Sequence, residues 1–422
     1  MYFLYNITVQ VASFSLNIIA IFNKKIKLFV EGRKGVFKTL EQQFFKKDKI
    51  IWFHCASLGE FEQGRPIIEK IKSQIPNPKS VFYNHKILVT FFSPSGYEIR
   101  KNYALADIVC YLPLDTKKNV RKFLELVHPE IAIFVKYEFW PNLLRELKRK
   151  EIKTILVSGI FRKEQSFFQW YGSWMKKSLH TFDHFFVQND ASKELLKNIG
   201  FTNTTHSGDT RFDRVYEVTQ QNIDFDFATQ FTKDKTTLIA GSTWQKDEEL
   251  LVDFINNNAT EHQRFIIAPH NIHQQNIEKL KQRISKKTIL FSEIKDTKLD
   301  EYQVLIINTI GILTQIYKYA DIAYVGGGFG SGIHNILEPA TFGVPIIIGP
   351  NYQKFNEAVD LVELKACTVI HNTSELKTVL NTFFNTISEQ ESKGQIASDY
   401  ILKNTGATQM IISYINKHFP KK

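Results

Sequence analysis

The sequence lacks the marks of several large protein classes. It has only three cysteines, Cys55, Cys110 and Cys367, which are far apart. An odd and scattered set of thiols argues against a disulfide scaffold and favours a reduced, cytosolic-facing protein. His54 precedes Cys55, but the pair ends an apolar strand-like run, where a small buried cysteine is more common than a nucleophile. Zinc-finger spacing, aromatic RNA-binding motifs and basic-region helices are absent, so nucleic acid is not expected as a partner.

The bulk composition predicts two folded domains and an acidic partner. A chain of 422 residues exceeds what one hydrophobic core usually organises, and its hydrophobic share of 43% is enough to fill two cores. The 54 basic residues outnumber the 43 acidic ones and leave a net charge of +11. This charge favours anionic lipid, phosphorylated ligands or nucleic acid and does not choose among them.

The N-terminal segment is uncharged and largely apolar. Residues 1–23 contain no Asp, Glu, Lys or Arg, and Lys24, Lys25 and Lys27 follow them. We interpret residues 1–30 as a membrane-anchor segment, long enough to cross a bilayer or, because polar residues dilute it, to lie in the interface. The basic cluster favours catalytic domains on the cytoplasmic side of the inner membrane. The alternative is an ordinary buried first helix.

From about residue 50, short apolar runs alternate with amphipathic segments, a pattern typical of parallel sheets covered on both faces. We therefore expect an α/β fold with two Rossmann-like, doubly wound domains over residues 48–211 and 236–400. The polar segment 212–235 is expected to be a linker, and residues 401–422 a C-terminal helix. Apolar runs predict the following strands: 50–53, 87–92, 108–112, 131–135, 154–157, 185–187, 237–240, 265–268, 304–307, 322–325 and 344–348.

A glycine-rich segment, Tyr324–Pro339, is the most specific motif. A strand over 321–325 leads into five glycines, and a helix over 335–342 is expected to start near Asn335. Such a loop lets backbone N–H groups approach phosphate, and Glu338 is suited to accept hydrogen bonds from ribose hydroxyls. No Gly-Lys-Ser/Thr follows, so it is not a Walker loop. The alternative is a tight structural turn.

These motifs, taken in order, resemble the Kdo (3-deoxy-D-manno-octulosonic acid) transferase family. The residues that carry the resemblance are Ser57–Glu60, Ser93–Gly96, Leu112–Asp115, Glu138–Asn142, Gly332–Pro339, Gly343–Pro345, Gly349–Pro350 and Phe355–Glu357. The resemblance covers nearly the whole chain. It implies a glycosyltransferase-B fold with two domains facing across a cleft and an N-terminal membrane helix. It also implies inverting transfer of Kdo from CMP-Kdo to a lipid A precursor, as in lipopolysaccharide biosynthesis, with no bound metal and no cofactor.

The resemblance also implies roles for individual residues. Glu60 matches the family's catalytic base, although a carboxylate at a helix start also stabilises the helix. Arg211 stands where the family has a lysine that stabilises the transition state, and its alternative is a solvated linker charge. The residues implied to surround the nucleotide are Pro269, His270, Gly311, Ile312, Leu313, Asn335, Ile336, Leu337 and Glu338.

Several positions depart from the family pattern where charge matters. Lys136 replaces an acidic residue two before Glu138, so either Glu138 takes over its role or Lys136 pairs with the donor carboxylate. His270 replaces an arginine at the expected phosphate site, Trp244 replaces a histidine, and Ile312 replaces an acidic residue.

The sequence is also compatible with three other functions. A UDP-sugar transferase or nucleotide-sugar epimerase would share the fold without needing the N-terminal segment. A non-catalytic membrane protein that binds nucleotide would keep the glycine loop. DNA glucosylation is suggested only by the positive charge, and steep salt-dependent DNA binding would be its first requirement.

Overall fold

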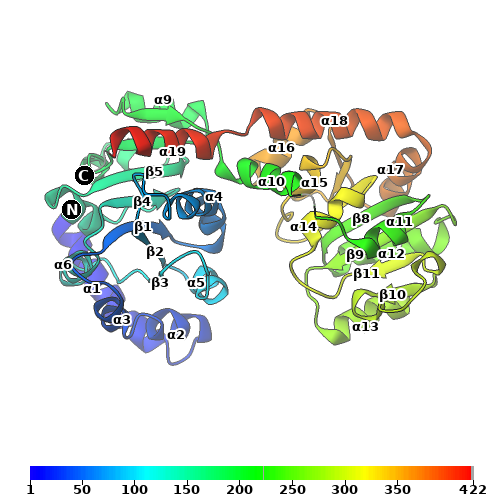
Figure 1. Ribbon diagram of the computed structural model, residues 1–422, viewed down its shortest axis with the longest axis horizontal. Helices are drawn as coiled ribbons and strands as arrows, with labels where there is room; N and C mark the ends of the chain where they lie inside the picture. Colours follow the sequence, from blue (N-terminus) through cyan, green and yellow to red (C-terminus); the bar gives the residue numbers. More distant parts are fainter. Residues whose placement is uncertain (222, 420–422) are drawn as a thin grey trace. The chain divides into compact units, whose positions relative to one another are not determined.

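A computed structural model describes residues 1–221 and 223–419 (Figure 1). The chain divides into two compact units. Unit 1 contains Met1–Asp213 and the residues from Thr405 onward, and unit 2 contains Arg214–Asn404. The chain therefore passes from unit 1 to unit 2 within α10 (Thr210–Gln220) and returns between α18 (Ile387–Lys403) and α19 (Ala407–His418).

Unit 1 is built on one parallel sheet. Within its described residues, seven strands follow the order β3-β2-β1-β4-β5-β6-β7. The strands are β1 (Lys49–Cys55), β2 (His85–Phe91), β3 (Ile108–Tyr111), β4 (Ile131–Val135), β5 (Lys153–Gly159), β6 (His184–Val187) and β7 (Thr204–His206). The helices are α1 (Tyr2–Ile19), α2 (Lys24–Glu31), α3 (Val36–Gln43), α4 (Leu58–Gln74), α5 (Pro94–Arg100), α6 (Lys117–Val127), α7 (Pro141–Arg149), α8 (Ser173–Leu179), α9 (Asp190–Asn198) and α19.

Both faces of this sheet are buried. Trp52 of β1 points into a core shared with α3, α6, α7, α8 and α9. Its neighbours Ile51 and Phe53 point the opposite way, into a core shared with α4 and α19. Successive strand residues face opposite sides, so a strand covered on both faces must be apolar at nearly every position. This explains the continuous apolar runs from which the central strands were predicted.

Unit 2 repeats this architecture (Figure 1). Its seven described strands are all parallel and follow the order β10-β11-β9-β8-β12-β13-β14. The strands are β8 (Thr236–Thr243), β9 (Gln263–Pro269), β10 (Thr288–Leu290), β11 (Val304–Ile306), β12 (Ile322–Val325), β13 (Ile346–Ile348) and β14 (Cys367–Val369). The helices are α11 (Asp226–Thr232), α12 (Gln245–Asn257), α13 (Gln274–Arg283), α14 (Leu313–Ile316), α15 (Leu337–Thr341), α16 (Asn356–Glu363), α17 (Thr373–Asn385) and α18.

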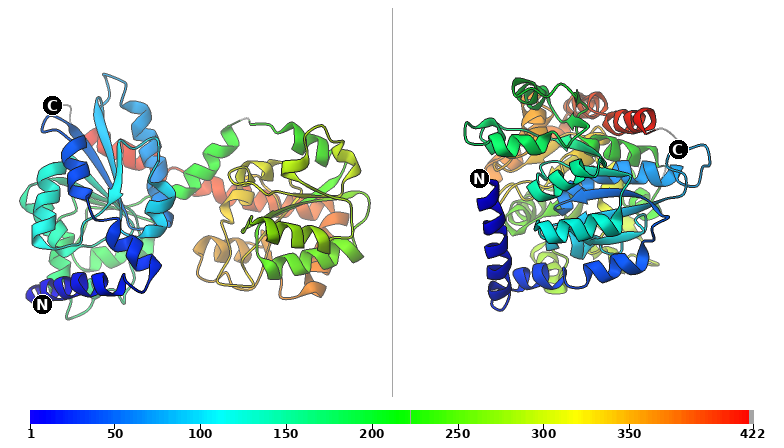
Figure 2. Two further views of the ribbon diagram at one scale, coloured as in Figure 1. Left: turned by 90° about the horizontal axis from the view of Figure 1, so that it is seen from below. Right: turned by 90° about the vertical axis from the view of Figure 1, so that its left-hand side faces the viewer.

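Helix α1 is part of unit 1 and lies along it (Figure 2), and several of its side chains form hydrogen bonds with the unit. The Tyr5 hydroxyl donates to Asp115 Oδ2 at 2.7 Å, and Asn142 Nδ2 donates to Asn6 Oδ1 at 3.1 Å. The Tyr2 hydroxyl also donates to Asn142. None of the helices in the described part of the chain combines the length and the apolar character needed to cross a bilayer.

Two sequence expectations need correction. Segment 212–235 was expected to be a linker, but it contains most of α10 and all of α11. Ala228 and Phe231 of α11 are buried because they lie three residues apart on one helix face and pack into unit 2. The helix expected over 335–342 is only Leu337–Thr341, since the Asn335 side chain accepts a hydrogen bond from the Leu337 N–H and Gly343, at φ +69°, follows its end.

Candidate functional site

The strand order of unit 1 brings two loops together. β1 pairs with β2 on one side and with β4 on the other, all in parallel. The chain leaves β1 into α4 and leaves β4 into a loop over residues 136–140, so the order reverses between these two strands. Ligands bind at such switch points, beyond the carboxyl ends of the strands. The residues that follow β1 and β4 therefore form the candidate active site of unit 1.

Glu60 lies in the first turn of α4. Ser57 caps this helix, and the Ser57 N–H donates to Glu60 Oε2 at 3.1 Å in a capping box. The carboxyl group thus has the structural role expected of a carboxylate at a helix start. It is also buried, with 7% of the residue exposed. A capping carboxylate is ordinarily solvated, so burial indicates a second role.

Glu138 belongs to a hydrogen-bonded chain that the sequence did not reveal. Its Oε2 accepts a hydrogen bond from Trp140 Nε1 at 2.6 Å and lies 3.1 Å from His54 Nε2. The other ring nitrogen of His54 lies 2.9 Å from Thr90 Oγ1. His54 is fully buried. These hydrogen bonds, which run from Thr90 through His54 to Glu138 and Trp140, fix the position of the Glu138 carboxylate.

The surroundings of Glu60 shift its acidity towards neutral pH. Burial raises the pKa of Glu60 to about 7, and the nearby Glu138 carboxylate adds to the rise. The backbone N–H groups of Ala56 and Ser57 and the Lys136 ammonium act in the opposite direction. A carboxyl group with a pKa near 7 is suited to accept a proton at neutral pH. Glu60, Lys136 and Glu138 are thus brought together by the fold.

Lys136 occupies an unusual backbone conformation. It directly follows β4 and has φ +74°, in the left-handed region that residues with a side chain rarely adopt. Its N–H donates to Val157 O at 3.0 Å, and its Nζ lies 5.1 Å from the centre of the Tyr137 ring. Strained residues of this kind cluster at functional sites. The positive charge therefore sits at the switch point despite the departure from the family's acidic residue.

Arg211 is held on α4 through a buried acid. Its Nε and Nη2 lie 3.0 and 2.9 Å from Asp209 Oδ2, and Gln63 Nε2 of α4 donates to the same oxygen at 2.8 Å. Burial opposes ionisation of Asp209, but the Arg211 guanidinium and these hydrogen bonds keep its pKa below the usual range. The alternative of a solvated linker charge does not hold, because Arg211 is a fixed guanidinium, much of whose charge Asp209 offsets.

In unit 2 the strand order reverses between β8 and β12, and the glycine loop follows β12. A side chain at Gly326 would come within 2.4 Å of Ser242 O, and one at Gly328 within 2.7 Å of the Gly349 backbone. Buried Asp247 accepts hydrogen bonds from the Gly327 N–H at 2.8 Å and the Tyr324 hydroxyl at 2.7 Å. At least part of the glycine pattern therefore serves close packing, as the alternative of a structural turn requires.

Three aromatic rings stack beside this loop. Trp244 and His270 have centroids 4.5 Å apart, and His270 and His334 also lie 4.5 Å apart. Trp244 Nε1 donates to His334 Nε2 at 2.9 Å. Burial, with a contribution from His270, lowers the pKa of His334 to about 4, so its imidazole is neutral at pH 7. Trp244 and His270 directly follow β8 and β9, whereas His334 lies in the glycine-rich segment after β12. His270, where the resemblance implies an arginine, lies in the middle of the stack.

The remaining predicted donor residues lie at the same edge of the sheet. Asn335 Nδ2 donates to Glu338 Oε1 at 2.9 Å, which orients the carboxylate proposed for a diol. Ile336 and Leu337 are buried and anchor this short helix. Gly311, at φ +103°, precedes Ile312 and Leu313, and the Leu313 side chain reaches the backbone of β8 at Gly241. Pro269 ends β9 next to His270.

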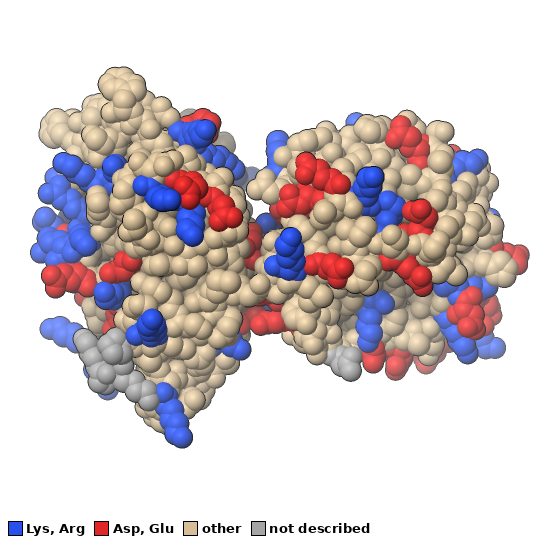
Figure 3. All heavy atoms as spheres, turned by 90° about the horizontal axis from the view of Figure 1, so that it is seen from above, with Lys and Arg blue, Asp and Glu red and all other residues tan. Residues whose placement is uncertain are grey.

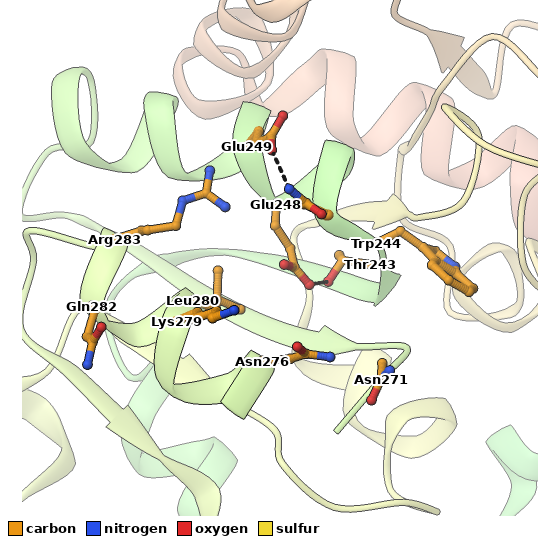
Figure 4. A pocket seen from close by; sticks show the side chains of 11 residues that line it. Thr243, Trp244, Glu248, Glu249, Asn271, Asn276, Lys279, Leu280, Gln282 and Arg283 are labelled. Atoms are coloured by element: carbon orange, nitrogen blue, oxygen red, sulfur yellow. Dashed lines mark hydrogen bonds between the residues drawn. The ribbon is translucent and has the colours of Figure 1, made fainter. Parts of the chain in front are cut away.

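A cavity of about 680 Å³ opens between α12 and α13, beside the ring stack (Figure 4). Trp244 and Asn271 border it, and the Thr243 hydroxyl contacts Glu248 at 3.3 Å inside it. In the described structure, none of the predicted donor residues lines this cavity. The predicted site therefore lies next to the cavity, on the side of Trp244 nearer the glycine loop.

The sequence matches known transferases over most of its length. Residues 30–214 match the family described as 3-deoxy-D-manno-octulosonic-acid transferase (kdotransferase). A 3-deoxy-D-manno-octulosonic acid transferase from Aquifex aeolicus is 28% identical over 87% of this chain and 97% of its own. One from Rickettsia bellii is 24% identical over 94% of this chain and 95% of its own. The chain is thus similar to Kdo transferases over most of its length. It is a glycosyltransferase.

Solved structures of other enzymes share this two-domain fold. A UDP-GlcNAc 2-epimerase from Neisseria meningitidis aligns with a TM-score of 0.60 and 13% identity, covering 87% of this chain and all of its own. A glycosyltransferase from Rickettsia africae aligns with a TM-score of 0.53 and 12% identity, covering 88% of this chain and 99% of its own. At these identities the likeness shows the fold, two parallel α/β units of the glycosyltransferase-B type.

The charges around Glu60 give this glycosyltransferase a specific pH dependence. A base works in its ionised form, so the transfer rate should rise with pH through about 7 and then level off. Glu138→Gln removes a charge that raises the pKa of Glu60. The rising part of the pH–rate profile should therefore move about one pH unit lower. Lys136→Gln should move it higher. Transfer rates measured against pH check both shifts. If the pH–rate profile moved in neither variant, the two charges would not act on the pKa of Glu60.

Proposed function

We propose that the enzyme transfers Kdo from CMP-Kdo to a lipid A precursor, with inversion and without a metal. The observation that carries the proposal is Glu60, a buried carboxyl with a pKa of about 7 at the switch point of unit 1. Glycosyl transfer to a hydroxyl needs a base of this kind. Similarity to Kdo transferases supports the choice of sugar, and the phosphorylated lipid acceptor agrees with the net charge of +11.

In the proposed reaction the acceptor binds unit 1 and the donor binds unit 2. Glu60 removes the proton from an acceptor hydroxyl, and the hydroxyl oxygen attacks the anomeric carbon of Kdo while its bond to the CMP phosphate breaks. A single displacement of this kind inverts the anomeric centre. Lys136 offers a cation for the donor carboxylate, whereas Arg211 adds only the charge that Asp209 leaves uncompensated.

Replacing the base provides the direct test. Incubation of the protein with CMP-Kdo and a lipid A precursor should add Kdo, which mass spectrometry detects and counts. Glu60→Gln should lower the rate about 10²- to 10⁴-fold, the usual contribution of a general base. Glu69→Gln, on the same helix and paired with Arg65 near the surface, is the matched control and should keep the rate.

Retention of most of the rate by Glu60→Gln would remove the base from the mechanism. Consumption of UDP-GlcNAc in place of CMP-Kdo would favour an epimerase or UDP-sugar transferase, whose fold this chain shares. Tight CMP binding with neither hydrolysis nor transfer would favour a protein that only binds nucleotide.

The donor assignment depends on Glu338. Its carboxylate, oriented by Asn335, is proposed to accept hydrogen bonds from both ribose hydroxyls. Glu338→Gln should weaken CMP binding about tenfold, because one charged hydrogen bond is worth about 1.5 kcal/mol or more. Calorimetric titration with CMP measures the change. Glu363→Gln, on the exposed end of α16, is the control, and equal affinities in the two variants would exclude the ribose contact.

Helix α1 is proposed to dock the enzyme on the cytoplasmic face of the inner membrane. Tyr2, Tyr5 and Asn6 of α1 face unit 1 together with the half-buried Val9 and Leu16, and other apolar side chains of α1 point outward. Phe3 is 77% exposed, Phe14 70% and Ile18 49%. Exposed apolar residues in one row are typical of interfacial helices, and Lys24, Lys25 and Lys27 follow at the start of α2. The lipid acceptor would then be met at the surface where it resides.

Removing the outward apolar face tests this docking. The triple variant Phe3→Ser, Phe14→Ser and Ile18→Ser should bind phosphatidylcholine vesicles at least about 100-fold more weakly, given ~1.5 kcal/mol or more for each buried side chain. Vesicle sedimentation measures the loss. The control Ile99→Ser, Ile387→Ser and Leu402→Ser removes three exposed apolar side chains elsewhere. Equal binding by both variants would argue against docking through α1.

A further inference from the structure

A basic recess lies between α6 and α7, beside the first turn of α1. Its volume is about 310 Å³, and Tyr2 and Val120 contribute to its walls. Lys117 and Arg121 enter it from successive turns of α6, and Arg145 and Arg149 enter it from successive turns of α7. Four cations thus converge from two helices on a space large enough for a phosphate group.

Most of this charge is uncompensated. Glu146 is the acid that lines the recess, and both of its oxygens are engaged by Arg149, with Nε at 2.9 Å. Among the described residues, no carboxylate oxygen lies within 4.0 Å of the charged nitrogens of Lys117, Arg121 or Arg145. Figure 3 shows basic side chains gathered along the left-hand edge of unit 1. Like charges held this close repel one another unless an anion binds between them.

The recess is also preorganised, because Tyr2 holds two of its cations in place. Lys117 Nζ lies 5.4 Å and Arg145 Cζ 5.0 Å from the centre of the Tyr2 ring. The Tyr2 hydroxyl donates to Asn142, a buried side chain whose backbone N–H donates to Asp115 Oδ2 at 2.9 Å. Cation–π contacts restrict flexible side chains that would otherwise extend into solvent. The ring that orders the cations belongs to the same helix whose apolar face points outward.

We infer that this recess binds the phosphodiester headgroup of an anionic membrane phospholipid. The inference rests on the proposed docking of α1, because it places the headgroup beside the apolar row that begins at Phe3 and Leu4. A fork-shaped guanidinium is suited to paired phosphate oxygens, and the recess presents two that no carboxylate engages, those of Arg121 and Arg145. Neutral lipid would satisfy the apolar row but would leave Lys117, Arg121 and Arg145 without a counter-charge. The recess therefore selects anionic surfaces.

The experiment compares vesicles of phosphatidylcholine alone with vesicles that also contain phosphatidylglycerol. The full-length protein should prefer the anionic vesicles, and Lys117→Gln, Arg121→Gln and Arg145→Gln together should reduce that preference at least about tenfold. Binding to neutral vesicles should stay unchanged. The matched control Lys295→Gln, Lys298→Gln and Lys377→Gln removes three exposed charges from unit 2 and should keep most of the preference.

A variant that leaves the net charge unchanged distinguishes a preorganised site from general electrostatic attraction to the membrane. Tyr2→Leu keeps an apolar side chain and the net charge but removes the ring, so it should lower the preference for anionic vesicles and leave neutral binding intact. An equal loss in the basic triple and the control triple, or a normal preference in Tyr2→Leu, would overturn the site. Titration with inorganic phosphate at physiological salt should show weak binding, and tight binding would instead indicate a soluble phosphate ligand and overturn the lipid assignment.

These outcomes are distinct from those that bear on the proposed function. All variants of the recess should transfer Kdo at the wild-type rate to a detergent-dispersed acceptor, because the recess contains none of the residues proposed for catalysis. A wild-type protein that transfers Kdo but binds neither kind of vesicle would end the inference and leave the transferase assignment standing. Loss of transfer in the dispersed assay by the basic triple would show that the recess serves the acceptor and would also overturn the inference.

Discussion

Both units place their first strand in the interior of a parallel sheet, and this constraint fixes where chemistry can occur. Strands are added on one side of β1 and later on the other, so α4 and the loop after β4 leave the same edge in different directions. At the carboxyl end of the sheet, the space between α4 and the loop after β4 is therefore not filled by a crossover helix. Glu60, Lys136 and Glu138 occupy it because each comes within five residues of a strand end.

The acidity of Glu60 results from opposing effects that the fold holds in place. Burial and Glu138 favour the neutral form, while two backbone N–H groups and Lys136 favour the ionised form. An acidic residue at this position, as the resemblance implies, would place a second negative charge where the Lys136 ammonium now is. The replacement therefore offsets the repulsion from Glu138 and keeps the pKa near neutrality. His54 and Trp140 matter for the same reason, because they fix the distance at which Glu138 acts.

The sequence predicted the central strands well and the edge strands poorly, for a physical reason. β1, β4, β8 and β12 are buried along nearly their whole length, and each contains an unbroken run of apolar residues. The strands that were not predicted, β7, β10 and β14, are each three residues long and lie at sheet edges, where fewer apolar side chains are needed. The same logic applies to the site. Glu60 was found through a local motif, whereas the His54–Glu138 pair joins positions 84 residues apart and leaves no local pattern.

Helix α1 shows why amphipathicity alone did not settle the N-terminal segment. An ordinary surface helix turns its apolar face to the core, but α1 binds its own unit through Tyr2, Tyr5 and Asn6. These polar contacts end on Asp115 and Asn142, buried groups that need partners for their own hydrogen bonds. The core-facing side of α1 is therefore specified by hydrogen bonding, which leaves the apolar side free to face a different environment. Because the ring of Tyr2 also orders the basic recess, orientation of the helix and placement of the cations depend on the same residue.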